Sequence, residues 1–271
     1  MPGATINRAI ARSTGSSLRD VDELGSVRPM PPLPPPSPLR ENFLLSVLIP
    51  VFDEKSTIRE IVTRVKAVPY RKEIVLVDDC SRDGTSDILK QMAAADPELR
   101  LLVHQKNLGK GAALRTAFGV AKGDVWIVQD ADLEYSPEDY PRLLKPIVDG
   151  LAHVVYGSRF AGGSYSRVHL FSHYLGNKLL TFSSNVFTGL NLTDMETCYK
   201  VMRREVAERI EIKSNRFNVE PELTAKIGRL KARLYEVPIS YAGRDFAEGK
   251  KISWRDGLWA LWAIVRYRFF D

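Results

Sequence analysis

The chain has 271 residues, of which 44% are hydrophobic and 27% charged, and its formal net charge is +6. This composition is ordinary for a soluble globular protein, and it excludes a collagen-like, a fully disordered or a disulfide-stapled chain. The sequence also predicts no membrane-spanning helix, because such a helix needs about 20 mostly apolar residues. The longest uninterrupted apolar run is Leu258–Val265.

Residues 1–41 differ in composition from everything that follows. Seven of the sixteen prolines lie within Pro29–Pro38, and such a run favours polyproline II over a helix or a sheet strand. We therefore expect a disordered, proline-rich arm that ends in a stiff spacer. A docking segment for a partner domain is one alternative. A transit peptide, suggested by the arginines and serines near the N-terminus, is another.

From Phe43 onward, short apolar runs alternate with helical patterns. The expected strands are Leu44–Val51, Glu73–Val77, Leu101–His104, Val125–Gln129 and His153–Gly157. The expected helices are Thr57–Val68, Ser86–Ala95, Gly109–Ala121 and Pro137–Asp149. This alternation predicts an α/β protein with a mostly parallel sheet and helices on both faces. In such sheets, ligands bind beyond the carboxyl ends of the strands.

Acidic residues follow two of the expected strands at the point where each strand ends. Asp78 and Asp79 come directly after the second strand, and Asp130 and Asp132 come after the fourth. Asp130 and Asp132 are two positions apart on an extended segment, so both carboxylates can point the same way. Converging carboxylates repel unless a cation lies between them, and oxygen ligands favour Mg²⁺ or Mn²⁺. An ordinary polar turn is the alternative.

A glycine-containing turn, Asn107–Gly111, opens the third expected helix and carries Lys110. Backbone N–H groups at a helix start attract anions, and a lysine adds positive charge. The turn therefore predicts an anion site, with an ordinary helix start as the alternative. Its spacing matches neither the GxxxxGK[ST] phosphate loop nor the GxGxxG dinucleotide fingerprint.

Taken as an ordered set, these motifs resemble the family 2 glycosyltransferases, whose GT-A fold is Rossmann-like. The set consists of Pro50–Glu54, Val77–Thr85, Asn107–Gly111 and Asp130–Glu134. Later motifs are similar to the dolichyl-phosphate mannose synthase branch and its bacterial polyprenyl-phosphate relatives, and these are Gly157–Phe160, Leu192–Lys200 and Asn218–Glu222. The resemblance covers residues 44–268. It implies a GT-A domain over 42–242, then a flexible loop and an amphipathic helix over 243–271.

The resemblance implies roles for residues at matching positions. For the nucleotide sugar these residues are Pro50, Phe52, Glu54, Asp78, Asp79, Lys110, Asp130 and Lys250. The implied ligands of Mg²⁺ or Mn²⁺ are Asp130, Asp132 and Glu134, although the family has glutamine at the third position. Arg159 and Arg244 are expected to bind the acceptor phosphate, and Asp194 to help arrange metal and donor. The expected catalytic set is therefore Asp130, Asp132, Asp194, Arg159 and Arg244.

The implied reaction moves a hexose, with inversion, from a UDP- or GDP-sugar to a polyprenyl or dolichyl phosphate at the cytoplasmic face of a membrane. A phosphate monoester arrives largely deprotonated because its second pKa is about 6, so no strong protein base is needed. We accordingly expect structural or surface roles for the histidines, which are His104, His153, His169 and His173. Two alternatives stay open: a soluble or protein-linked acceptor, and a non-catalytic nucleotide-binding or membrane-surface module.

Two segments could bring the chain to a membrane. Ser166–Thr188 is rich in Leu, Phe and Tyr, and Trp254–Phe270 carries an apolar stripe with arginines beside it. Such a helix is typical of peripheral binding to an anionic membrane, with packing of the stripe on the core as the alternative. The basic stretch Lys200–Arg233 also favours an anionic partner. It lacks a nucleic-acid-binding motif, so we expect no nucleic acid partner, and a homo-oligomer stays open.

Overall fold

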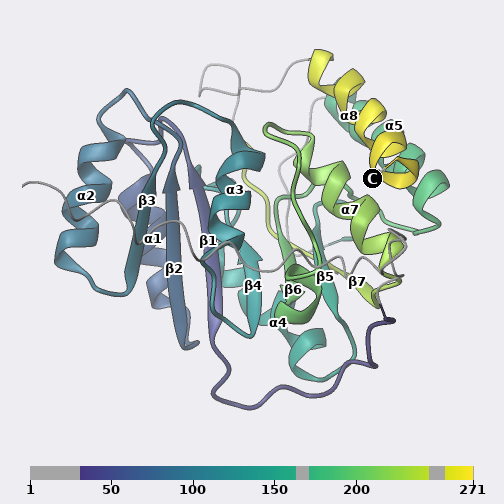
Figure 1. Ribbon diagram of the computed structural model, residues 1–271, viewed down its shortest axis with the longest axis horizontal. Helices are drawn as coiled ribbons and strands as arrows, with labels where there is room; N and C mark the ends of the chain where they lie inside the picture. The colour runs from purple at the N-terminus through teal and green to yellow at the C-terminus, as the bar shows by residue number, and fades with distance from the viewer. Residues whose placement is uncertain (1–30, 163–170, 244–253, 271) are drawn as a thin grey trace, which may run out of the picture. The chain divides into compact units, whose positions relative to one another are not determined.

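The computed structural model describes residues 31–162, 171–243 and 254–270 (Figure 1). From Leu33 onward, these residues are built on a seven-stranded sheet with the order β3-β2-β1-β4-β6-β5-β7. Its strands are β1 (Leu45–Val51), β2 (Lys72–Asp78), β3 (Leu99–Val103), β4 (Val125–Val128), β5 (Val154–Ser158), β6 (Lys200–Arg203) and β7 (Leu234–Pro238). Strand β6 runs antiparallel to β4 and β5, whereas the other neighbours are parallel. The expected mostly parallel α/β sheet is confirmed.

Helices pack against this sheet and against one another. Those described are α1 (Ile58–Ala67), α2 (Thr85–Ala95), α3 (Lys110–Phe118), α4 (Tyr140–Val148), α5 (Phe171–Thr188), α6 (Arg204–Ala207), α7 (Val219–Arg229) and α8 (Trp254–Phe269). Helix α3 contacts β1 and β2, and α4 contacts β5, β6 and β7. Helices α5, α7 and α8 contact one another and lie together in Figure 1. None of the described helices is long and apolar enough to cross a membrane.

Burial explains why the local patterns form these elements. Strand β1 is buried except at Pro50, because a central parallel strand is covered on both faces. Helix α1 buries the apolar stripe that its spacing predicts, which is Ile58, Ile61, Val62 and Val65. The strands and helices expected between residues 44 and 157 are all present, with small differences at their ends.

Strands β6 and β7, which are not among the expected strands, and the start of α4 differ from what the sequence pattern indicates. The pattern does not predict β6, because only two of its four residues, KVMR, are apolar and each end of the segment carries a charge. The helix expected over Pro137–Asp149 begins as a 3-10 turn, Pro137–Asp139. There Oγ of Ser136 accepts the N–H of Glu138 at 3.3 Å, which favours the tighter turn before α4 begins.

Residues 33–41 are the last part of the segment expected to be a disordered arm, yet they pack on the folded unit. Leu33 and Leu39 lie against the hydrophobic core. Nε2 of His153 lies 2.7 Å from the carbonyl oxygen of Pro34. Because Nδ1 of this histidine accepts a backbone N–H, Nε2 carries the proton and donates it. His153 therefore has the structural role expected for it.

Candidate active site

The sheet has a switch point at β1, because the chain continues to β2 on one side and later to β4 on the other. Such a switch point opens a crevice in which ligands bind. The loops after β1, β2 and β4 each contain a non-glycine residue with positive φ, namely Asp53 (53°), Cys80 (65°) and Leu133 (64°). Such backbone is uncommon and concentrates at functional sites. Topology and backbone geometry thus indicate the same edge of the sheet.

The predicted nucleotide-binding residues after β1 and β2 lie at this edge. The two strands run side by side in register up to Asp78, and the N–H of Glu54 donates to Oγ1 of Thr85 at 3.0 Å, which joins the two loops. Pro50 and Phe52 are partly exposed. Asp78 is fully buried, and its carboxylate accepts hydrogen bonds from its own loop. The nucleotide contacts of these residues stay predictions.

Asp79 holds the loop in front of helix α3. Its buried carboxylate accepts the backbone N–H groups of Leu108 at 2.9 Å and Gly109 at 2.6 Å. It also lies 2.7 Å from Nδ1 of His104. Asp79 thus shapes the glycine turn ahead of Lys110. Sequence reasoning missed the histidine partner, because the two residues are 25 positions apart and no local pattern links them.

Lys110 connects the loop after β4 to helix α7. Its Nζ lies 2.9 Å from Oδ1 of Asp130 and 3.1 Å from Oε1 of Glu220. Glu220 in turn pairs with Lys200, whose side chain is fully buried. Burial by itself lowers the pKa of Lys110, but the acidic groups around it, led by the Asp130 carboxylate and including Glu220, together outweigh burial, so this pKa lies well above its usual value. Lys110 is therefore a permanent cation beside a predicted metal ligand.

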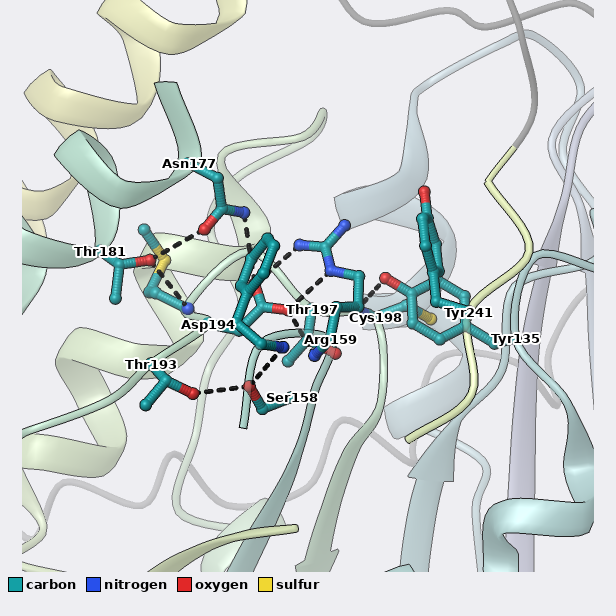
Figure 2. Close-up of polar contacts among 12 residues, drawn as sticks. Tyr135, Ser158, Arg159, Asn177, Thr181, Thr193, Asp194, Thr197, Cys198 and Tyr241 are labelled. Carbon is teal, nitrogen blue, oxygen red and sulfur yellow. Dashed lines mark hydrogen bonds and ion pairs between the residues drawn. The ribbon is translucent and has the colours of Figure 1, made fainter. Parts of the chain in front are cut away.

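Arg159 and Asp194, both expected in the catalytic set, form a two-pronged ion pair (Figure 2). Nε of Arg159 lies 2.6 Å from Oδ2 of Asp194, and Nη2 lies 2.7 Å from Oδ1. Asn177 of α5 donates to Oδ1 at 3.2 Å. Burial by itself raises the pKa of Asp194, but Arg159 outweighs burial and holds this pKa below its usual value. The guanidinium also lies 5.2 Å from the ring centroid of Tyr241, a cation–π distance.

The acidic segment after β4 carries the predicted metal ligands. The N–H of Glu134 donates to Oδ1 of Asp132 at 3.1 Å, and the hydroxyl of Tyr241 donates to Oε2 of Glu134 at 2.7 Å. Within the part of the chain that the structure describes, no three histidine, cysteine or carboxylate side chains form a group that could hold a metal ion by themselves. Magnesium is usually held by one or two carboxylates together with substrate phosphates. The oxygen donors of Asp130 and Asp132 fit that requirement.

Two expected site residues, Arg244 and Lys250, lie outside the described residues, as does His169. Sequence reasoning also missed one carboxyl group. Burial, reinforced by the nearby Glu220, raises the pKa of Glu196 to about 7, and its Oε1 has no hydrogen-bond partner among the described residues. The sequence does contain a feature that could have drawn attention to Glu196. This residue begins the segment in which the sequence departs from the family pattern.

The strand order, the antiparallel β6 and the acidic loops at the carboxyl ends of β2 and β4 define an α/β protein of the GT-A type. The model of glycosyl transferase family 2 matches residues 46–211. The chain belongs to this family, and it is accordingly a glycosyltransferase.

Known relatives agree with this assignment. Undecaprenyl-phosphate mannosyltransferase of Micrococcus luteus is 30% identical over 213 residues, which cover 75% of this chain and 85% of that protein. Polyprenol monophosphomannose synthase of Mycolicibacterium smegmatis is 30% identical over 222 residues, with 79% and 83% covered. Glucosyl-3-phosphoglycerate synthase of Mycobacterium tuberculosis, crystallised with Mn²⁺, UDP-glucose and phosphoglyceric acid, has a TM-score of 0.63 at 17% identity, with 84% and 81% covered. This last likeness is one of fold.

Proposed function

We propose that this glycosyltransferase moves a hexose from a UDP- or GDP-sugar to a polyprenyl or dolichyl phosphate at a membrane surface. The names of the Micrococcus luteus and Mycolicibacterium smegmatis relatives support this class of acceptor. The observation that carries the proposal is the orientation of helix α5 (Phe171–Thr188), which lies against the Arg159–Asp194 pair. This helix has its polar stripe inside and its apolar stripe outside.

The inward stripe of α5 is hydrogen-bonded to the site. Asn177 donates to Asp194, and Oγ1 of Thr181 accepts the N–H of Met195 at 3.1 Å. The outward stripe consists of large apolar side chains that are each more than half exposed: Phe171, Leu175, Leu179, Phe182 and Val186. Contiguous exposed apolar surface of this kind marks a site of interaction with a membrane or a protein. An amphipathic helix of this kind fits the interfacial layer of a membrane.

Helix α8 extends this apolar surface. It contacts α5, and it buries Ile264 while exposing Trp259, Trp262 and Phe269. The Arg266 guanidinium lies 4.9 Å from the Trp262 ring centroid. Aromatic side chains with arginine beside them suit the boundary between acyl chains and anionic headgroups. Peripheral association with the cytoplasmic face of a membrane is therefore part of the proposal.

The donor would lie in the crevice at the carboxyl ends of β1, β2 and β4. Asp130 and Asp132 would hold Mg²⁺ or Mn²⁺ there, and the metal would neutralise negative charge on the leaving diphosphate. Lys110 would add a fixed positive charge to the same group. Mn²⁺ accompanies UDP-glucose in the Mycobacterium tuberculosis structure, which supports the same choice of metals for this fold.

Transfer would take place in one inverting displacement. Arg159, kept charged and oriented by Asp194, would hold the acceptor phosphate near the sugar. A phosphate oxygen attacks the anomeric carbon as the bond from that carbon to the nucleoside diphosphate breaks, and the electron pair of the broken bond leaves on the diphosphate. Because a phosphate monoester has a second pKa of about 6, this oxygen arrives without a proton and needs no protein base.

The test incubates the purified full chain with Mg²⁺ or Mn²⁺, vesicles that contain undecaprenyl phosphate, and a panel of radiolabelled UDP- and GDP-hexoses. We expect one donor to place label in the organic extract, and Asp132→Asn to abolish this. Asp87→Asn is the matched control, because the Asp87 side chain is 79% exposed on α2. Label confined to the aqueous phase would instead support a soluble acceptor. Absence of transfer with every donor would support the non-catalytic alternative.

A further inference from the structure

Lys178 of helix α5 points towards the acceptor side of the site. Its Nζ lies 3.1 Å from the carbonyl oxygen of Thr193 and 4.7 Å from the ring centroid of Phe160. These two residues are the chain neighbours of Asp194 and Arg159, respectively. The ammonium group therefore lies beside the Arg159–Asp194 pair.

Lys178 differs in its partners from the buried lysines Lys200 and Lys226 and from the partly exposed Lys110. Each of those three forms an ion pair with a carboxylate, and the pairs are Lys110–Asp130, Lys200–Glu220 and Lys226–Glu222. Lys178 is only partly exposed, yet among the described residues its polar and aromatic contacts are a carbonyl oxygen and two rings, with no carboxylate. Its positive charge is therefore left uncompensated by the described part of the protein.

The charge balance of the described part of the acceptor side favours a phosphate beside this lysine. Arg159 is matched by Asp194, which is fully buried and ionised because its pKa lies below its usual value. The pair thus contributes no net charge. A phosphate monoester brings about −1.5 to −2 charges at neutral pH, and moving such an anion out of water requires compensating positive charge. Within the described residues, Lys178 provides it.

Lys178 is also placed at the border of the apolar surface. One helical turn before it and one turn after it are Tyr174 and Phe182, which are 40% and 66% exposed. Residues four positions apart lie on the same face of a helix, and the Lys178 ammonium lies 5.6 Å from the Tyr174 ring centroid. A phosphate bound at this ammonium would therefore have an apolar surface beside it for an attached hydrocarbon chain.

We infer that Lys178 binds the phosphate group of the acceptor, a phosphate monoester carried on a prenyl chain whose first units lie along the exposed face of α5. This inference rests on the proposed function and adds to it a specific phosphate ligand. A soluble phosphate monoester shares the same charge but gains nothing from the apolar surface.

The test compares two phosphate monoesters as acceptors for the full chain with its preferred donor: undecaprenyl phosphate in vesicles and phosphoglyceric acid in solution. Lys178→Gln keeps a hydrogen-bond donor for the Thr193 carbonyl and removes the charge, whereas Lys178→Arg keeps the charge. Lys145→Gln is the matched control, because the Lys145 side chain is 73% exposed on α4. Lys178→Met replaces K178Q if the latter unfolds at the assay temperature.

We expect K178Q to raise the KM for undecaprenyl phosphate by about tenfold or more, the loss of one charge-assisted hydrogen bond. The KM for the donor should not change. K178R should raise the KM for undecaprenyl phosphate less than K178Q does, and K145Q should match the wild type. If the wild type makes lipid-linked sugar and K178Q keeps its acceptor KM, the inference is overturned while the proposed function stands. If the wild type makes none, both are overturned. A K178Q defect confined to phosphoglyceric acid would overturn the assignment to a prenyl phosphate.

Discussion

The Nζ atom of Lys110 lies 2.9 Å from Oδ1 of Asp130, one of the carboxylates predicted to bind metal. A cation already stands at this carboxylate, so a metal ion that binds Asp130 must share it or displace the lysine. Through Glu220, the same lysine is linked to Lys200 in the buried strand β6. Ion pairs thus connect the predicted donor site to the interior of the sheet.

Lys110→Met should tighten the binding of Mn²⁺ to the protein without nucleotide by about tenfold, because Asp130 loses its competing cation. The same variant should lower kcat, because the leaving diphosphate loses a positive charge. Titration followed by electron paramagnetic resonance measures the Mn²⁺ affinity, and initial rates measure kcat. Lys145→Met is the control. Equal Mn²⁺ affinities for K110M and the wild type would contradict the competition.

Asp194→Asn should lower the free energy of unfolding by about 3–5 kcal/mol, because it leaves the charge of Arg159, whose side chain is only 12% exposed, unpaired. Urea unfolding measures this loss. Asp87→Asn, on the exposed surface of α2, should change the same quantity by no more than about 0.5 kcal/mol. A loss as small for D194N as for D87N would show that Arg159 is well solvated without its partner.

The same pair predicts how stability depends on pH. The pKa of Asp194 is lower in the folded protein than in the unfolded chain, where it is about 3.9, so ionisation of Asp194 favours folding. This contribution is present above about pH 4 and is lost as the pH falls through the depressed folded pKa. The difference in unfolding free energy between the wild type and D194N should therefore be largest near neutral pH and shrink in acid. A difference that grows in acid would refute this sign.

Glu196 has the opposite dependence. The pKa of Glu196 is about 7 in the folded protein and about 4.3 in the unfolded chain. Its contribution to the free energy of unfolding is therefore full below about pH 4 and is lost as the pH rises through about 7. Glu196→Gln imitates the protonated form and should be more stable than the wild type by about 1–3 kcal/mol at pH values near 8. Urea unfolding across this range measures the difference. Exposed Glu138→Gln should show no such trend.

Gly111 leaves no room for a side chain. A Cβ atom there would lie inside van der Waals contact with the carbonyl oxygen of Ser214. Gly111→Ala should therefore lower the free energy of unfolding by about 1–3 kcal/mol, and it should lower activity by displacing Lys110. Gly119→Ala is the control, because the nearest atom to its Cβ is 3.5 Å away. Thermal unfolding that does not distinguish the two variants would rule out this steric conflict.

The apolar face of α5 should determine membrane binding. Phe182→Glu places a charge on a side chain that is 66% exposed, and it should weaken binding to phosphatidylglycerol vesicles by about tenfold or more, the value of burying one phenylalanine. Leu151→Glu, at an exposed position outside α5 and α8, is the control. Co-sedimentation with vesicles measures both. Equal binding by F182E and the wild type would place the membrane contact elsewhere.

Local sequence patterns were sufficient for five of the seven described strands, β1 to β5, and for the edge of the sheet that carries the site. Strand β1 and helix α1 could be predicted because continuous burial and a 3.6-residue period are properties of neighbouring residues. Asp78 and Asp130 could be placed at one edge because the carboxyl ends of parallel strands meet there. The motifs that carry the resemblance to the family consist of neighbouring residues. They could therefore be identified without knowing which distant residues are in contact.

Only the tertiary structure decided which charges meet. Arg159 and Asp194 are 35 positions apart, and Lys110 and Glu220 are farther apart still; such pairs depend on the strand order, including the antiparallel β6 that the pattern did not reveal. Helix α5 has an amphipathic sequence, but the sequence alone does not say which face is turned inward. Here the polar face is buried, because Asp194 and the loop before β6 offer it hydrogen bonds, and this leaves the apolar face to the outside.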